Sequence, residues 1–379
     1  MRARLATDFE RFKSGLPRDF ANYIRDTYRV DLAAQYLGQP LPHPIGKGSG
    51  QLSLRTDQLE TDRDAGLAFV VLKTLIAEDH SGHQSMGAWA IHEARMQVER
   101  RRSNAGQDGW TVTWKGRGWD RSLADYLALV RAGRDLTRAG GPLVIPSVKY
   151  HLPRSGEPFR EDEYRHTTGE LARSFGDGPL LLEKDFSPTL AGDALAGERE
   201  QVLRWIRDVP ALIRAGAPNG VLVALKLMNS RFDDAFQLTM LDAALGADGA
   251  TVFNRLFDTE RGTAYGGYDL SERNLRVLDL ARAKGMRPKQ LSGTGNICSG
   301  RVILEYARRG AESVQLHTFF QLPLGEYSAT KGSRTQRALH ALLFHPHEGL
   351  IAGMLDLEEQ QVIARTEGEL RFLDVAQTV

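Results

Sequence analysis

The chain has 379 residues, 41% hydrophobic and 26% charged, so it can bury a large core as one α/β domain or as two smaller ones. A formal net charge of +1 gives no basic footprint for nucleic acid, and the single cysteine excludes a disulfide framework or an all-cysteine iron–sulfur cluster within the chain. No apolar run has the length of a signal-peptide core or a membrane span, so we expect a cytoplasmic protein without membrane contact.

Short runs rich in leucine and β-branched residues alternate with longer amphipathic stretches, a pattern typical of a parallel sheet with crossover helices. The predicted strands are 44–48, 68–73, 142–148, 179–186, 221–227, 250–255, 291–294 and 313–318. Strong helix patterns lie between them, as at 198–215 and 270–284. Eight such units close most economically into an α/β TIM (β/α)8 barrel, and a doubly wound open sheet is the second interpretation.

Three segments extend this minimal barrel. Residues 1–35 are predicted to be a helical extension, 36–325 the barrel, and 326–379 a C-terminal helix and tail packed on it. An insertion after the second strand contains a two-stranded excursion at 104–119. The basic run Arg100-Arg101-Arg102 is interpreted as the solvated end of a helix and not as a binding patch.

The chemistry of such a barrel gathers at the carboxyl ends of its strands. The first strand ends in small residues, Gly48-Ser49-Gly50, which allow a flat ring to approach the backbone or simply permit a tight turn. Lys73 and Lys226 end the apolar runs of the second and fifth strands. Two lysines in one mouth repel each other unless negative charge lies between them, so they predict an anionic or reducible ligand, and pairing with a structural carboxylate is the other interpretation of Lys73.

Two further strand ends carry polar groups. Asn254 and Arg255 follow the sixth strand and place a side-chain amide beside a permanently charged guanidinium group, which suits a polar planar substrate. After the seventh strand, the turn 293–296 precedes a helix that Ser299 can cap and that runs to Arg309. Exposed backbone N–H groups and a helix N-terminus predict a phosphate there, although an ordinary βα turn can also carry glycine.

Taken in order, these segments resemble the dihydroorotate dehydrogenase family, which also includes the pyrimidine-oxidising flavin domain of dihydropyrimidine dehydrogenase. The resemblance rests on Pro44-Ile45-Gly46, Gly48-Ser49-Gly50, Leu72-Lys73-Thr74, Leu225-Lys226-Leu227, Asn254, Ser292-Gly293-Thr294-Gly295, Val314-Gln315, Thr318 and Phe320-Gln321-Leu322-Pro323. It implies a TIM barrel that holds FMN across its strand ends. The implied cofactor residues are Gly48, Ser49, Lys73, Thr74 and Lys226 around the flavin, and Thr294, Gly295, Asn296, His317 and Thr318 around its phosphate.

The resemblance also implies catalytic and substrate residues. Ser187, before Pro188, matches the family's general base, with Asp185 as a neighbour that assists proton transfer. Lys73 and Asn254 are expected to orient the substrate, together with Gln84, Asp185 and Arg255. Because Gln84 replaces one of the family's substrate-binding asparagines and other amides are lost, the sequence argues against dihydroorotate itself.

The hypothesis is therefore an FMN-dependent oxidoreductase acting on CH–CH bonds, which transfers a hydride between flavin N5 and a pyrimidine-like or other conjugated cyclic lactam. A separate electron donor or acceptor is expected, and a homodimer is compatible with the resemblance. One alternative is a phosphate-binding barrel lyase or isomerase with a Schiff-base lysine at 73 or 226; another is a non-catalytic descendant of the flavin barrel. The spacing of the histidines matches no metal motif, so no metal is predicted.

Overall fold

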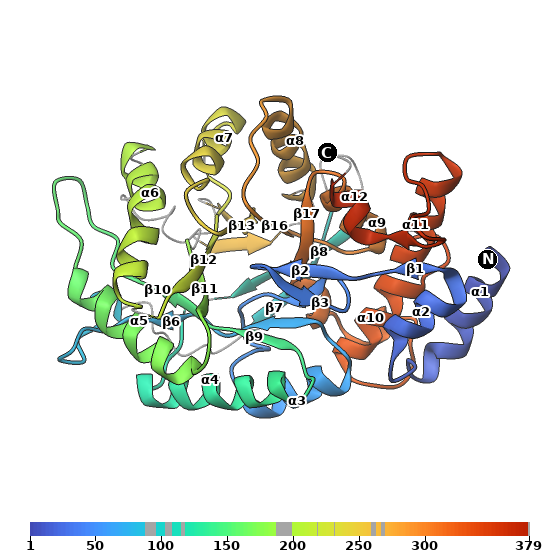
Figure 1. Cartoon of the computed structure of the whole chain (residues 1–379), viewed down its shortest axis with the longest axis horizontal. Coiled ribbons are helices and arrows are strands. Elements are labelled where there is room, and N and C mark those ends of the chain that lie inside the picture. The colour runs from blue at the N-terminus through green and yellow to red at the C-terminus, as the bar shows by residue number, and fades with distance from the viewer. Residues whose placement is uncertain are drawn as a thin grey trace.

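The structure, a computed structural model, describes residues 1–87, 96–102, 108–114, 118–186, 199–217, 219–230, 232–258, 263–266 and 270–377. Its centre is a ring of parallel strands surrounded by helices (Figure 1). The strands are β4 (Ile45–Lys47), β5 (Phe69–Val71), β9 (Leu143–Ile145), β10 (Ser147–Lys149), β11 (Leu180–Asp185), β12 (Val221–Lys226), β13 (Gly249–Val252), β16 (Leu291–Thr294) and β17 (Ala311–Leu316), with the short β6 (Leu75–Ile76) beside β10.

The ring closes through one interrupted strand. The sheet order is β6-β10-β11-β12-β13-β16-β17-β4-β5-β9, and only Pro146 separates β9, at one end of this order, from β10, near the other. Proline has no backbone N–H and cannot donate within a ladder, so the third strand pairs with β5 through β9 and with β11 through β10. The eight-stranded TIM-barrel prediction is confirmed, with its third strand in two pieces.

Helices follow the barrel strands and cover their outer faces. They are α3 (Thr56–Asp64), α4 (Leu123–Arg138), α5 (Glu161–Phe175), α6 (Arg199–Ala215), α7 (Asp234–Ala243), α8 (Leu270–Ala283) and α9 (Gly300–Ala307). Ser122, Asp233 and Ser299 begin three of them as N-caps whose side chains accept a backbone N–H of the first turn. Among the described residues, no helix is both long enough and apolar enough to cross a membrane.

The two ends of the chain pack together beside the barrel (Figure 1). The N-terminal part forms α1 (Arg2–Arg11), the 3-10 turn η1 (Phe12–Ser14) and α2 (Phe20–Tyr28), and the C-terminal part forms η5 (Thr318–Gln321), η6 (Leu324–Glu326), α10 (Arg334–Phe344), α11 (Leu350–Glu359) and α12 (Phe372–Gln377). A parallel pair of short strands, β1 (Val30–Asp31) and β18 (Leu370–Arg371), joins them. The stacking of Phe9 on His340, with ring centroids 4.6 Å apart, adds an aromatic contact between α1 and α10.

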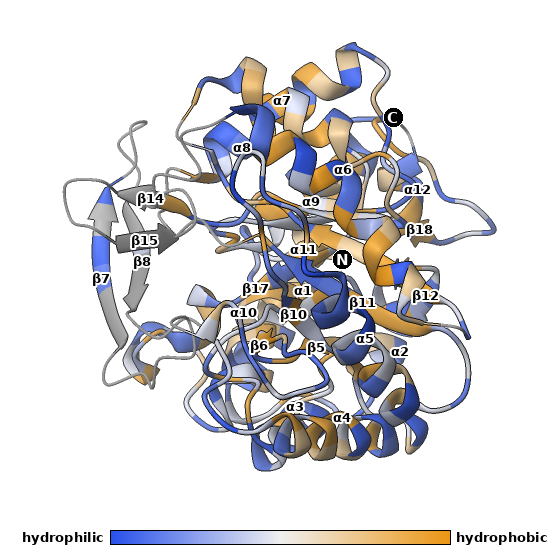
Figure 2. Ribbon diagram, turned by 90° about the vertical axis from the view of Figure 1, so that its left-hand side faces the viewer, coloured by the Kyte–Doolittle hydropathy of each residue, from blue (hydrophilic) through white to orange (hydrophobic). Residues whose placement is uncertain are grey.

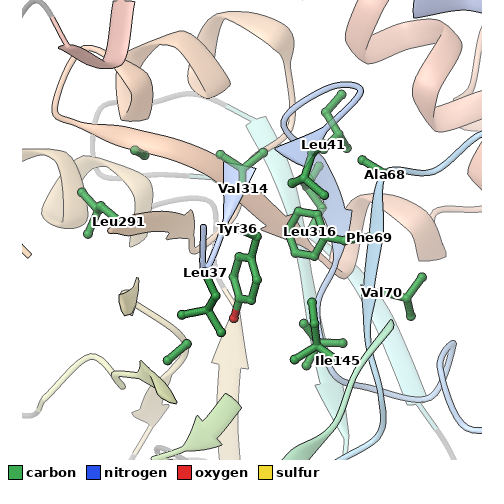
Figure 3. Packing of buried hydrophobic residues seen from close by; sticks show 14 of the residues in the cluster. Tyr36, Leu37, Leu41, Ala68, Phe69, Val70, Ile145, Leu291, Val314 and Leu316 are labelled. Atoms are coloured by element: carbon green, nitrogen blue, oxygen red, sulfur yellow. The ribbon is translucent and has the colours of Figure 1, made fainter. Parts of the chain in front are cut away.

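A small hairpin before the first barrel strand brings an aromatic residue into the barrel. Its strands, β2 (Ala34–Tyr36) and β3 (Gln39–Leu41), are joined at Leu37 and Gly38, both with positive φ as a tight hairpin turn requires. The Tyr36 ring stacks on Phe69 of β5, with centroids 4.9 Å apart (Figure 3). Its hydroxyl lies 3.4 Å from the Glu183 carboxylate, so the hairpin contributes to the interior beneath the mouth.

Two insertions combine into a second sheet that stands off the barrel (Figure 2). The first supplies β7 (Met96–Arg102) and β8 (Asp108–Trp114), and the second supplies β14 (Leu256–Asp258) and β15 (Thr263–Gly266), which pairs with β8. Both insertions follow the carboxyl ends of barrel strands, so the sheet belongs to the mouth side. The helical interpretation of Arg100 to Arg102 is wrong, because these residues lie in β7 and pair with β8. The predicted excursion at 104–119 therefore begins earlier than expected.

Candidate active site at the barrel mouth

Lys226 lies at the centre of the mouth, inside the ring of strands. Its Nζ donates to Gln315 Oε1 at 3.0 Å and lies 3.4 Å from Glu183 Oε1. Gln315 Nε2 in turn donates to Glu183 Oε2 at 2.6 Å, which ties three strands, β11, β12 and β17, through one polar network. All three side chains are buried, so the network has the paired charges and hydrogen bonds that a polar barrel interior needs.

The small residues after β4 lie over this network. A Cβ placed on Gly48 would sit 3.5 Å from Lys226 Nζ, so Gly48 lies directly beside the ammonium. Ser49 Oγ lies 2.8 Å from Thr74 Oγ1, and Thr74 Oγ1 lies 3.2 Å from Ser147 Oγ. Lys73, next to Thr74, is buried, and its backbone N–H donates to Ser53. The first two strand ends and the third thus share a chain of hydroxyl groups.

Positive charge converges on His317, which follows β17. Burial holds the pKa of His317 well below its ordinary value, and Arg255, Lys73 and Lys226 lower it further, so the ring is neutral at physiological pH. Gln321 lies 2.7 Å from Nδ1 of the ring and donates to it. The imidazole rests on Gly50, where a Cβ would overlap the ring. Lys73, Lys226 and Arg255, which follow three different barrel strands, therefore all affect the His317 ring.

The turn after β16 contains two consecutive residues with positive φ. Gly295 has φ +106° and Asn296 has φ +53°, and Thr294 Oγ1 donates to the Gln315 carbonyl at 2.9 Å. The side-chain amide nitrogen of Asn296 is buried and has no hydrogen-bond partner. A buried donor in this state is stabilised by any acceptor that reaches it, which a phosphate or carbonyl ligand can supply.

The N-terminus of α9 contributes less to this turn than the sequence suggested. Ser299 caps the helix as expected and accepts the Val302 N–H at 3.3 Å. The Arg301 N–H donates to the Glu348 carbonyl at 3.2 Å, and the connection between α10 and α11 packs against Gly300. Two N–H groups of the first turn are therefore already used within the chain, so the predicted phosphate would depend mainly on the turn 293–296.

Three expected substrate residues lie on two mouth segments, Asn254 and Arg255 after β13 and Gln84 after β6. Asn229 holds the backbone of Asn254, because its side-chain Nδ2 donates to the Asn254 carbonyl at 2.5 Å. Arg255 follows, partly buried. Gln84 Nε2 donates to the Ile76 carbonyl at 3.3 Å, which anchors the loop after β6 to the strand that precedes it.

Below the same loop, Glu163 of α5 accepts the Ser85 N–H at 3.3 Å and the His151 N–H at 2.6 Å. Burial raises the pKa of Glu163, while its hydrogen bonds with Ser85 and His151 oppose that rise. This contact links the loops after β6 and β10.

The structure brings Gly48, Ser49, Lys73, Thr74, Lys226, Arg255 and His317 to one end of the barrel, with Thr294, Gly295, Asn296 and Thr318 on the two neighbouring turns and Asp185, Gln84 and Asn254 on the adjoining strand ends. Ser187 lies outside the described residues. Sequence reasoning missed Lys149, Glu183, Gln315 and Asn229 as members of the site. Two of them carry a signal in the sequence. Lys149 ends an apolar strand as Lys73 and Lys226 do, and Gln315 belongs to a segment on which the family resemblance rests.

The donor set fits a flavin with an anionic tail. Gly48 allows close approach to the backbone, Lys73 and Lys226 provide positive charge, and Asn296 provides a buried donor without a partner. Among the described residues, no group of three histidine, cysteine, aspartate or glutamate side chains could hold a metal ion.

Comparison with solved structures supports the fold. The crystal structure of DHODH from Eimeria tenella in complex with ferulenol matches with a TM-score of 0.60 and 14% sequence identity, over 91% of this chain and 88% of that one. At this identity the similarity shows the TIM-barrel fold alone. No protein-family model matches the chain, and no curated protein sequence matches it.

Proposed function

We propose that this chain is an FMN-dependent oxidoreductase that transfers a hydride between flavin N5 and a conjugated cyclic lactam, pyrimidine-like in shape and different from dihydroorotate. The main support is that Lys73 and Lys226 are both buried at the carboxyl end of the barrel, where they and Arg255 lower the pKa of His317. Cations that gather in a buried mouth favour a ligand with negative charge. Bound FMN would supply hydride acceptance or donation at N5, together with a phosphate.

The residues of the chain have separable tasks in this proposal. Lys226 would place a fixed positive charge beside the flavin, and Gly48 would let the ring approach its Nζ. Asn296 and the turn that contains it would receive the phosphate. Lys73 and Asn254 would orient the substrate, and Ser187 would exchange a proton with the substrate carbon next to the one that exchanges the hydride.

Two other functions have less support. A Schiff-base lyase or isomerase needs a lysine amine that can reach a substrate carbonyl, whereas Lys226 Nζ is held between the Glu183 carboxylate and the Gln315 side-chain oxygen, at 3.4 and 3.0 Å. A non-catalytic flavin barrel would share the cofactor residues and differ only in its response to reductants. The flavin oxidoreductase accounts for both the cations and the polar substrate edge.

The deciding experiment is the visible absorption spectrum of the purified protein, followed by the mass of any chromophore released on unfolding. We expect a flavin spectrum, the mass of FMN, and bleaching when a reduced substrate of the lactam class is added without oxygen. A colourless protein that cannot be loaded with FMN, or that is trapped by borohydride with a carbonyl substrate, would overturn the proposal. A flavin that no reductant bleaches would favour the non-catalytic alternative.

A further inference from the structure

A row of three charged side chains crosses the mouth on adjacent strands. Asp185 of β11 is in register with Lys226 of β12, and Val148 of β10 is in register with Lys184, which places Lys149 beside Asp185. Alternation along β11 puts Asp185 on the same face as Glu183, whose carboxylate meets Lys226 inside the barrel. Asp185 therefore faces the barrel interior, one layer nearer to the mouth than Glu183.

The carboxylate of Asp185 has fewer partners than a buried charge normally has. One oxygen, Oδ2, lies 3.4 Å from Lys149 Nζ, which is a long contact, and the other, Oδ1, has no hydrogen-bond partner. Asp185 as a whole is 8% exposed, and its side chain is 12% exposed. Rotation about the terminal torsion exchanges the two oxygens at little cost, so either one can face an incoming group.

The neighbouring lysines keep this carboxyl group ionised. Burial alone would raise the pKa of Asp185, but Lys149, Lys226 and Lys184 together hold it below its ordinary value. An ionised carboxylate only accepts hydrogen bonds. A ligand that meets it must therefore present a donor, and a ligand that presents a carbonyl or carboxylate oxygen at this point is repelled.

We propose that Asp185 is a specificity-determining residue that accepts a hydrogen bond from a ring N–H of the substrate, and that Lys149 is the positioning residue that holds its carboxylate. This inference rests on the proposed function and narrows its substrate class to cyclic lactams or ureides with an unsubstituted N–H. A ring without that donor leaves a buried charged acceptor poorly paired, which is the strongest form of discrimination that a polar site provides.

The test compares two rings of the same shape. In 2-pyridone the ring position next to the carbonyl is an N–H, and in 2-pyrone it is an oxygen. Dissociation constants are measured by ligand-observed NMR titration of the protein as purified, with the flavin difference spectrum as a second readout. We expect the wild-type protein to prefer 2-pyridone by about tenfold or more, the effect of a hydrogen bond to a charged group.

Two variants and one control assign this preference. Asp185→Asn keeps the shape and removes the charge, so the preference should fall by roughly fivefold, and Asp185→Ala should abolish it. Asp62→Asn is the matched control, because Asp62 is also buried and paired with a lysine, Lys47, but lies in α3 outside the ring of strands. Asp62→Asn should keep the wild-type preference even if it lowers stability.

The outcomes separate this inference from the proposed function. Equal affinity of the wild-type protein for the two rings, failure of both to bind, or an unchanged preference in Asp185→Asn would overturn the role of Asp185. If the protein proves colourless and cannot be loaded with FMN, the NMR titration still measures the preference. If a protein that cannot be loaded with FMN still prefers 2-pyridone to 2-pyrone, and loses this preference in Asp185→Ala, the inference about Asp185 holds while the flavin proposal fails.

Discussion

Replacement of Lys226 by methionine tests the structural and the cofactor roles of the mouth together. Glu183 is fully buried, and Lys226 is the cation that its Oε1 contacts, at 3.4 Å. Removal of one partner from a buried ion pair leaves the other charge uncompensated, which costs about 3–5 kcal/mol. We therefore expect Lys226→Met to lower the free energy of unfolding by an amount in that range, measured by urea denaturation followed by circular dichroism.

The double variant Lys226→Met/Glu183→Gln separates the two roles. The introduced glutamine side chain is neutral and keeps hydrogen-bonding groups for Gln315 and Tyr36, so most of the lost stability should return, on the order of 2 kcal/mol or more. Flavin affinity, measured from the visible absorbance retained after dialysis, should stay at least about tenfold weaker in both variants. Wild-type flavin affinity in the double variant would refute the cofactor role of Lys226. Equal stability of the single and double variants would refute the dependence of Glu183 on its cation.

Three further changes test other parts of the structure. Burial, and after it the charge of Lys149, lowers the pKa of Lys184 from 10.5 to about 7. The free-energy cost of holding the charged amine in the folded protein is therefore complete below about pH 7 and disappears as the pH rises towards 10.5, the pKa of the unfolded state. Lys184→Met should thus raise the free energy of unfolding below pH 7 and change it little near pH 10. An equal increase at both pH values would show that the lowered pKa of Lys184 is not the cause. Lys47→Met should cost about 3–5 kcal/mol in urea denaturation, because Asp62 is buried 2.5 Å from the ammonium, and recovery is expected in Lys47→Met/Asp62→Leu. Gly295→Ala forces a Cβ to within 2.6 Å of the Phe253 carbonyl at φ +106°, so thermal unfolding should show a loss of roughly 1–3 kcal/mol and FMN should bind less tightly; unchanged values would mean that the turn relaxes.

The strand ends were predictable where one lysine follows one continuous apolar run. Lys73 and Lys226 both satisfy this condition, and the positions of their strands fix them at the mouth. Lys149 satisfies it only in part, because Pro146 divides its strand into β9 and β10 and the predicted strand stops at 148. A local pattern identifies a residue of this kind only when the strand that carries it is unbroken.

Other members of the site depend on contacts between distant parts of the chain. Tyr36 reaches Glu183 across 147 positions, from a hairpin that precedes the first barrel strand, and no local pattern indicates this contact. The same reason explains the error at Arg100 to Arg102. Their basic side chains suggested a solvated helix end, whereas pairing of β7 with β8, and of β8 with β15 from the second insertion, makes the segment a strand.

The polar groups of the mouth form two layers whose functions differ. In the deeper layer, Lys226, Glu183 and Gln315 satisfy one another through contacts of 2.6–3.4 Å, so substitutions there should act first on stability. In the outer layer, Lys73 and Arg255 act on His317 by charge, and Asp185 has an oxygen without a partner. We expect a ligand to contact the outer groups, so substitutions there should change affinity and selectivity more than stability. Lys226 belongs to the deeper network and also acts on His317, which is why its replacement alone tests both layers at once.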